Sequence, residues 1–390
     1  MTLSMVEQGP SKYKGTGSHA ARAGMGRLRA ANSQDQARVN GWERRHEDDT
    51  FVESHAHHSR RSHGGESLLA KFNRLADEYR EDLIKGESGE ICGFAGKAVL
   101  VRAVDGEEIF CQVRQVLKKR ISGVKNPLCI GDRVRFARTN EGGEGGVIDA
   151  VEPRSNQLAR TDSHNKALMH VFAANIDRLV VVASMADPDL KHGLIDRYLL
   201  IAAHNNIAAT VVLTKTDLRE GTATRALYEN IGIPAFAVCT RHSEGIADVR
   251  AHLAGQSCVV AGQSGVGKSS LVNALFPDIA ARVGLVAQAG HGRHTTTSAR
   301  SYVVGGGGRL IDTPGIRECG ITGMTALDVA LFYPDLAVYH PQCRFDDCSH
   351  MHEPDCAVRA AVTNGAITAT RYESYRSIIT EDLAGESSSS

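Results

Sequence analysis

The spacing of hydrophobic positions changes several times along the chain, and each change predicts a different kind of element. Residues 66–85 carry apolar side chains at helical spacing, which predicts one amphipathic helix. From residue 91 to about residue 152 the apolar positions fall into short runs separated by turns, namely GKAVLVRAVDG, EEIFCQVRQVL, GDRVRFAR and GGVIDAVEPR. About five short strands in roughly 60 residues is the size of a small β-barrel such as an OB-fold.

Between residues 168 and 320, apolar β-like runs alternate with helical stretches such as GLIDRYLLIAAHNN and TATRALYENIG. The runs are RLVVVAS (178–184), ATVVLTK (209–215), IPAFAVC (233–239), SCVVAGQ (257–263) and RLIDTPG (309–315). This alternation predicts a mostly parallel sheet with helices on both faces. The glycine run at 305–308 predicts a tight turn between two antiparallel strands at the edge of that sheet.

The first 65 residues are rich in Gly, Ser, Arg and His, and they contain few aliphatic side chains. Such a segment buries too little apolar surface to offset the entropy of ordering, so we expect a mostly disordered and mildly basic arm. We therefore divide the chain into five parts. They are the arm (1–65), a helical linker (66–90), the barrel (91–160), an α/β domain (161–330) and a C-terminal domain (331–385).

Formal charge is balanced over the whole chain, with 45 basic and 45 acidic residues, so it indicates no partner. The barrel segment has a local basic surplus, and the loop KKRISGVK at 118–125 holds four of its cations. Barrels of this type often bind RNA through a positive face, although an ordinary solvated surface is the alternative. The chain has no apolar run long enough to span a membrane and no secretory leader, which predicts a cytoplasmic protein.

A phosphate-binding loop begins at Gly262, where GQSGVGKSS fits the pattern G-x-x-x-x-G-K-[ST] between an apolar strand and a helical run. The backbone N–H groups of such a loop surround the phosphates, Lys268 reaches the β- and γ-phosphates, and the Ser269 hydroxyl ligates Mg²⁺. The residues predicted to bind GTP here are Gly262, Gln263, Ser264, Gly265, Val266, Gly267, Lys268, Ser269 and Ser270.

Two further segments predict the parts of a GTPase that sense the γ-phosphate. In DTPG, Asp312 would help to hold Mg²⁺, and the Gly315 N–H would bond the γ-phosphate. In GRHTTTS (292–298), either Thr295 or Thr296 would ligate Mg²⁺ with its hydroxyl. The position after Gly315 is Ile316, which cannot orient an attacking water as a glutamine would. His294 is the candidate for that catalytic role, and packing within the same segment is the alternative.

The segment TKTD predicts recognition of guanine, because the Asp217 carboxylate can accept hydrogen bonds from guanine N1–H and the 2-amino group. The Lys215 stem would lie along the purine, and Thr214 stands where Asn is commoner. The segment VCTRHSEG would support the base, with Cys239 and Thr240 where Ser and Ala are usual. TKTD precedes the phosphate loop, whereas an ordinary GTPase has the opposite order. A circular permutation accommodates every motif in one fold.

Residues 343–356 read CRFDDCSHMHEPDC and predict a closed, structural Zn²⁺ site. Its ligands would be Cys343, Cys348, His350 and Cys356, with His352 as a possible substitute for His350. The other six cysteines are scattered singly through apolar stretches, as reduced core thiols would be.

The barrel segment, the motif order TKTD, GQSGVGKSS, GRHTTT, DTPG and the final C-x4-C-x-H-x5-C together resemble the circularly permuted GTPases of small ribosomal subunit biogenesis, RsgA/YjeQ. The resemblance covers about residues 91–380. It implies an OB-fold, a permuted P-loop GTPase and a zinc domain. It also implies binding to the 30S subunit and its rRNA, with ribosome-stimulated hydrolysis of GTP to GDP by a monomer. The alternatives are a GTP-dependent RNA-binding module and a GTPase with a non-ribosomal partner.

Overall fold

The computed structural model describes residues 67–78, 86–96, 98–115, 117, 128–139, 145–161, 169–279, 300–312, 321 and 324–383. The expected arm (1–65) and the basic loop 118–125 lie outside the described residues. One helix, α3 (Leu68–Asp77), precedes the first strand. Ser67 caps it by accepting a hydrogen bond from the Ala70 N–H at 3.1 Å. The helix is shorter than the expected helix 66–85, of which residues 79–85 are not described.

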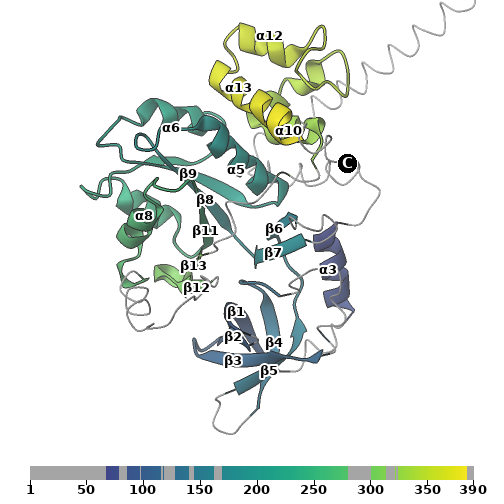
Figure 1. Cartoon of the computed structure of the whole chain (residues 1–390), viewed down its shortest axis with the longest axis vertical. Helices are drawn as coiled ribbons and strands as arrows, with labels where there is room; N and C mark the ends of the chain where they lie inside the picture. The colour runs from purple at the N-terminus through teal and green to yellow at the C-terminus, as the bar shows by residue number, and fades with distance from the viewer. Residues whose placement is uncertain are drawn as a thin grey trace, which may run out of the picture. The chain divides into compact units, whose positions relative to one another are not determined.

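Five strands close a barrel (Figure 1), and their bounds are β1 (Glu87–Ala95), β2 (Ala98–Ala103), β3 (Glu108–Val113), β4 (Arg133–Arg138) and β5 (Gly145–Val151). They pair in the order β1-β2-β3-β5-β4, and a pairing of β1 with β4 completes the ring. The β3–β5 pair is parallel and the others are antiparallel. This order is that of a five-stranded OB-type barrel. The barrel begins at Glu87, inside the segment expected to be a helical linker.

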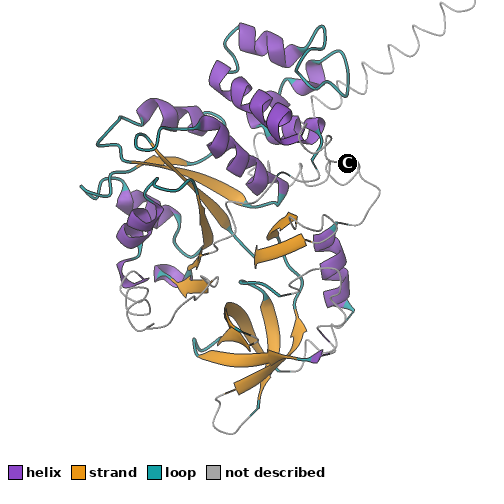
Figure 2. Ribbon diagram, in the orientation of Figure 1, coloured by secondary structure: helices purple, strands orange, loops and turns teal. Residues whose placement is uncertain are grey.

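A hairpin and an α/β sheet follow (Figure 2). The strands are β6 (Gln157–Thr161), β7 (Met169–Ala174), β8 (Arg178–Ser184), β9 (Ala208–Thr214), β10 (Ala235–Ala237), β11 (Ser257–Ala261), β12 (Arg300–Val303) and β13 (Arg309–Asp312). The helices between them are α5 (His192–His204), α6 (Thr222–Glu229), α7 (Ile246–His252) and α8 (Lys268–Leu275). Strands β10, β9, β8, β11 and β13 are parallel neighbours in that order, as the alternating pattern predicted.

Alternate residues of β8 divide the core of this sheet between two helical layers. Leu179 and Val181 belong to the hydrophobic cluster that includes Tyr198 and Leu200 of α5. Val180 and Val182 belong to a second cluster that includes Leu271 of α8 and residues of α7. Because successive side chains of a strand point to opposite faces, a strand buried on both faces reads as an unbroken apolar run.

The prediction that the glycine run joins two edge strands is half right. Strands β12 and β13 are antiparallel and are joined through Gly305–Gly308, where Gly306 and Gly307 have positive φ. Neither strand lies at an edge, however. β13 lies between β11 and β12, and β12 pairs on its other side with β1 of the barrel, so that one continuous sheet joins the two domains. The pattern could not reveal this, because β12 and β1 are about 200 residues apart.

The C-terminal part is helical: α10 (Ala326–Phe332), α11 (Pro334–Ala337), α12 (Ala357–Thr363), α13 (Ala369–Ser377), and the short turns at His340–Gln342 and Ile378–Leu383. Arg371 of α13 attaches it to the α/β domain. The guanidinium is 3% exposed and pairs with Asp196 of α5, which is fully buried. It also forms a two-pronged pair with Asp335 at 2.9 and 3.0 Å and lies 4.4 Å from the Tyr333 ring centroid. Removing one partner of such a pair would strand a buried charge, so it is a strong attachment.

Candidate functional site

The phosphate loop connects β11 to α8 and has the backbone that its glycines permit. Gly262, Gly265 and Gly267 all have positive φ, at 145°, 80° and 89°. At Gly262 a Cβ atom would lie 2.2 Å from the Val182 carbonyl oxygen, so only glycine fits beside β8. Lys268 is the first residue of α8, and its Nζ donates to the Gly262 and Gln263 carbonyls at 2.9 and 2.5 Å. The ammonium group is therefore held over the loop.

Thr214 joins the predicted guanine loop to the phosphate loop. Its hydroxyl lies 2.5 Å from the Val266 carbonyl oxygen and 3.2 Å from the Ala183 carbonyl oxygen, and the residue is 2% exposed. The contact crosses β8, which separates β9 from β11 in the sheet. TKTD and GQSGVGKSS, which are about 50 residues apart in sequence, thus meet at the carboxyl ends of two parallel strands on either side of β8. This is where open α/β sheets bind ligands. From the sequence Thr214 is predicted to bind GTP, at a position where Asn is commoner, but its link to the phosphate loop is not predictable from the sequence.

The remaining TKTD side chains face two neighbouring loops. Lys215 has φ of 57°, and its ammonium group donates to the Asp187 carbonyl. The Asp217 carboxylate lies 3.3 Å from the Arg241 guanidinium, whose side chain is 75% exposed. Arg241 belongs to the predicted base-supporting segment, in which Cys239 and Glu244 exchange two backbone hydrogen bonds of 3.1 Å. The structure therefore places Asp217 beside that segment, and the sequence analysis did not single out Arg241.

Asp312 ends β13 in register with the phosphate-loop strand. The parallel pairing of Val259 with Ile311 places Asp312 alongside the end of β11, just before Gly262. The Asp312 side chain is exposed. His294, Thr295, Thr296, Gly315 and Ile316 lie outside the described residues, so their predicted roles stay predictions. Among the predicted Mg²⁺ ligands, the structure thus describes Ser269 at the start of α8 and Asp312 at the end of β13.

The four predicted zinc ligands converge. The Sγ atoms of Cys343, Cys348 and Cys356 and a ring nitrogen of His350 all lie within 4.8 Å of one another. His350 Nδ1 is 3.4 Å from Cys356 Sγ and 3.6 Å from Cys343 Sγ. His352 is exposed and outside this group, so the geometry favours His350 over the substitute considered from the sequence. Three thiolates and one imidazole fit a tetrahedral structural Zn²⁺ site, and four protein ligands leave no position for a water.

Surrounding groups fix the shape of this cluster. Glu353 accepts hydrogen bonds from the Ser349 N–H and hydroxyl at 2.8 and 2.5 Å and from the Met351 and His352 N–H groups at 3.1 and 3.2 Å. Burial raises the pKa of Glu353, but these hydrogen bonds outweigh it and lower that pKa to about 2. The Tyr372 hydroxyl donates to the His350 carbonyl at 2.7 Å. The ligand loop is therefore tied to α13 as well as to itself.

His340 lies directly behind His350, and the sequence analysis overlooked it. Its Nδ1 is 3.1 Å from His350 Nε2, and the two rings are nearly perpendicular at 86°. For His350 Nδ1 to bind a metal it must be unprotonated, so the proton is on Nε2, which donates to His340. His340 also bonds the backbone of Asp346, which orients its own ring. The position of His340, three residues before the predicted ligand Cys343, is the sequence feature that could have identified it.

His340→Phe is expected to weaken Zn²⁺ binding about 10- to 100-fold, because the substitution keeps the ring but removes the acceptor that fixes His350. The measurement is competition for Zn²⁺ against a chromophoric chelator of known affinity. His352→Phe is the matched control, since His352 is exposed, and it should bind like the parent. Equal affinities for parent and His340→Phe would show that His340 does not orient the ligand.

Comparison with known proteins identifies a family that this chain resembles. Residues 151–322 match the RsgA GTPase family. The Small ribosomal subunit biogenesis GTPase RsgA of Histophilus somni (strain 129Pt) is 37% identical over 284 residues, which cover 70% of this chain and 78% of that protein. The protein of the same name from Pseudomonas fluorescens (strain Pf0-1) is 39% identical over 305 residues, covering 76% and 86%.

Two solved structures have a similar fold. The crystal structure of YjeQ from Thermotoga maritima matches with a TM-score of 0.61 and 29% identity, covering 76% of this chain and 98% of that one. YloQ, described as a circularly permuted GTPase, matches with a TM-score of 0.62 and 27% identity, covering 77% and 96%.

Proposed function

Because this chain belongs to the RsgA GTPase family, we propose that it is a GTP hydrolase that acts in late assembly of the small ribosomal subunit. The observation that carries the hydrolase assignment is the Thr214–Val266 contact, since it brings a guanine loop and a phosphate loop together in permuted order. The proposed partners are the 30S subunit with its rRNA, and GTP or GDP. We propose a cytoplasmic monomer, and none of the described helices is long and apolar enough to cross a membrane.

In the proposed site each segment has its own task. Asp217 selects guanine, Lys215 covers the purine, and Thr214 fixes the distance between base and phosphates. The loop from Gly262 to Ser270 holds the phosphates with backbone N–H groups, and Lys268 adds a cation. Ser269, Asp312 and Thr295 or Thr296 would hold Mg²⁺, which would neutralise phosphate charge, and Gly315 would contact the γ-phosphate. Zn²⁺ at Cys343, Cys348, His350 and Cys356 is structural.

We propose that the chain has the five parts expected from the sequence. One boundary changes, because the first strand of the barrel begins at Glu87. The barrel is the proposed rRNA-binding domain. A non-enzymatic RNA-binding module would not require Lys268, Ser269 and Asp312 together at one end of the sheet. This arrangement therefore favours hydrolysis over nucleotide binding alone.

The test is GTP turnover with and without purified small subunits, together with co-sedimentation of the protein with those subunits. We expect small subunits to stimulate turnover, and His294→Ala to abolish the stimulation while GTP binding is preserved. Retained stimulation in His294→Ala would remove that residue from the mechanism. Failure of the parent protein to bind small subunits in the presence of a non-hydrolysable GTP analogue would contradict the ribosomal role.

A further inference from the structure

The backbone ladder between the barrel and Asp312 is only one residue wide. Arg300, at the start of β12, is opposite Asp312 of β13 on one side and opposite Gly93 of β1 on the other. Among the described residues, Gly93 and Arg300 form the one backbone pairing between β1 and β12, whereas β12 and β13 pair over four residues. A change in the barrel that moves Arg300 therefore acts directly on the strand that ends in Asp312.

Side chains reinforce this narrow contact. Glu108 of β3 accepts from Arg102 Nη2 at 2.8 Å and lies 3.1 Å from Arg300 Nη2. The same Arg102 Nη2 donates to the Ser301 carbonyl at 2.8 Å. We call Arg102, Glu108 and Arg300 the junction cluster. A second pair, Glu90 of β1 with Arg309 of β13 at 2.5 Å, lies nearby. Both strands of the β12–β13 hairpin are thus bound to the barrel through charge.

Several buried polar atoms at the junction are incompletely satisfied. Glu90 Oε1, Arg102 Nη1 and Ser301 Oγ are buried and have no hydrogen-bond partner among the described residues. By contrast, the buried Arg154 of the barrel pairs with both Asp132 oxygens at 2.7 and 2.8 Å. Unsatisfied buried polar groups cost free energy, so an arrangement that pairs them would recover that cost. The junction therefore has the property expected of an element that can shift.

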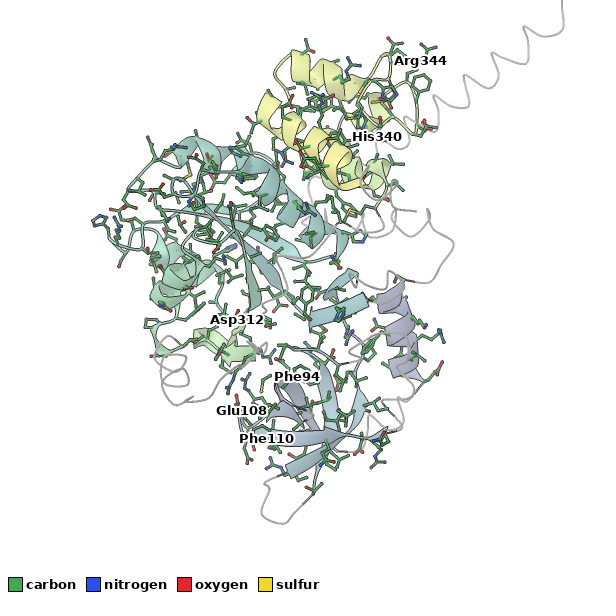
Figure 3. All side chains as sticks on the ribbon, viewed as in Figure 1. Phe94, Glu108, Phe110, Asp312, His340 and Arg344 are labelled. Carbon is green, nitrogen blue, oxygen red and sulfur yellow. The ribbon has the colours of Figure 1, made fainter. Side chains whose placement is uncertain are left out.

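The surface beside the cluster fits a nucleic acid. Phe110, two residues after Glu108 on the same outward face of β3, is 52% exposed. Figure 3 shows Glu108 and Phe110 on the same side of the barrel. An exposed aromatic ring beside guanidinium groups is the combination that binds single-stranded RNA, by stacking on bases and pairing with phosphates. The Arg300 side chain is 39% exposed, so a phosphate can reach it.

We propose that RNA on the barrel stimulates GTP hydrolysis by taking Arg300 from Glu108, and that Glu108 and Arg300 are positioning residues for Asp312. In the free protein Glu108 holds Arg300 and β12 in a resting position. A phosphate group replaces the carboxylate as the partner of Arg300, so β12 moves and β13 moves with it. This inference rests on the proposed function, because it takes the barrel ligand to be RNA.

Glu108→Gln tests the inference without any RNA. Loss of the carboxylate charge releases Arg300, so the rate of single-turnover GTP hydrolysis by the variant alone should rise. The expected increase is about two- to fivefold, which corresponds to the free energy of one partly exposed ion pair. The additional stimulation by small subunits should fall by a similar factor. Glu87→Gln is the matched control. Glu87 pairs with Arg138 on the same barrel at 3.0 Å rather than with Arg300, so the rate of this variant should equal that of the parent.

Arg300→Met gives a second route to the same answer if Glu108→Gln folds poorly, as a melting curve would show. Because both residues act through one contact, the double variant should be no faster than the faster single variant. Unchanged unstimulated rates in both single variants, or fully additive effects in the double variant, would overturn the inference. If the parent is not stimulated by small subunits, the ribosomal function fails, but the unstimulated rates still decide whether the junction controls Asp312.

Discussion

Asp217→Asn should change the preferred nucleotide from GTP to xanthosine triphosphate. In the proposed site the Asp217 carboxylate would accept two hydrogen bonds from guanine. An amide would present its N–H₂ group to the guanine 2-amino group, so that two donors would face each other. Xanthine carries an oxygen at that position and accepts from the amide. Sites built around hydrogen bonds discriminate strongly, so the ratio of the two affinities should change by about 10⁴. Competition binding of the two nucleotides with a fluorescent analogue measures this ratio.

The control for this prediction is Asp189→Asn, which removes an 86% exposed carboxylate on a neighbouring loop and should leave the preference for GTP intact. Loss of the Asp217–Arg241 pair is a minor effect, because a pair with one partner so exposed contributes about 0–1 kcal/mol. An Asp217→Asn variant that still prefers GTP by the parent's margin would show that another segment reads the base.

Removal of Zn²⁺ should unfold the ligand loop and α12 while the α/β sheet remains folded. Without metal, three thiols and the fully buried His350 would share one small volume without a common partner. Structural zinc sites contribute about 10–16 kcal/mol of apparent binding free energy. Amide hydrogen exchange after chelation should show lost protection across residues 343–363 and retained protection in β8, β9 and β11.

Restoring Zn²⁺ should restore protection, and Cys348→Ala should reproduce the chelated state without a chelator. α13 should lose less protection than α12, because Arg371 still binds Asp196 and Asp335. Unchanged exchange across residues 343–363 after verified loss of metal would show that the cysteine cluster is not the organising element of this region.

Local features of the fold were predictable from the chain because they depend on neighbouring residues. The apolar run RLVVVAS coincides with β8, and the motif GQSGVGKSS gives the boundary between β11 and α8. Boundaries were less predictable, since α3 begins at Leu68 rather than at residue 66, and β1 starts at Glu87, before the expected start of the barrel at residue 91. Nothing in the alternation of residues 87–90 distinguishes a strand from a linker before its partner, β4, is known.

The candidate site also combines features that were predictable from the sequence with features that were not. Ligand identities follow from residue type and spacing, so Cys343, Cys348 and Cys356 converge as predicted. Contacts between distant segments do not follow from spacing. The Thr214 hydroxyl, the Arg241 partner of Asp217 and the His340 ring behind His350 become visible only when strands and loops are assembled. The choice between His350 and His352 likewise needed the burial of each side chain.

The permuted chain gives the DTPG segment a second role. In the described structure β13 ends at Asp312 inside the sheet, and the next described helix, α10, belongs to the C-terminal part, which Arg371 attaches to α5. The segment after Asp312 is therefore also the covalent tether between the nucleotide site and the zinc-containing part. The same two parts of the protein are therefore joined twice, once covalently through the chain that follows Asp312 and once through the contacts of Arg371 with Asp196 and Asp335.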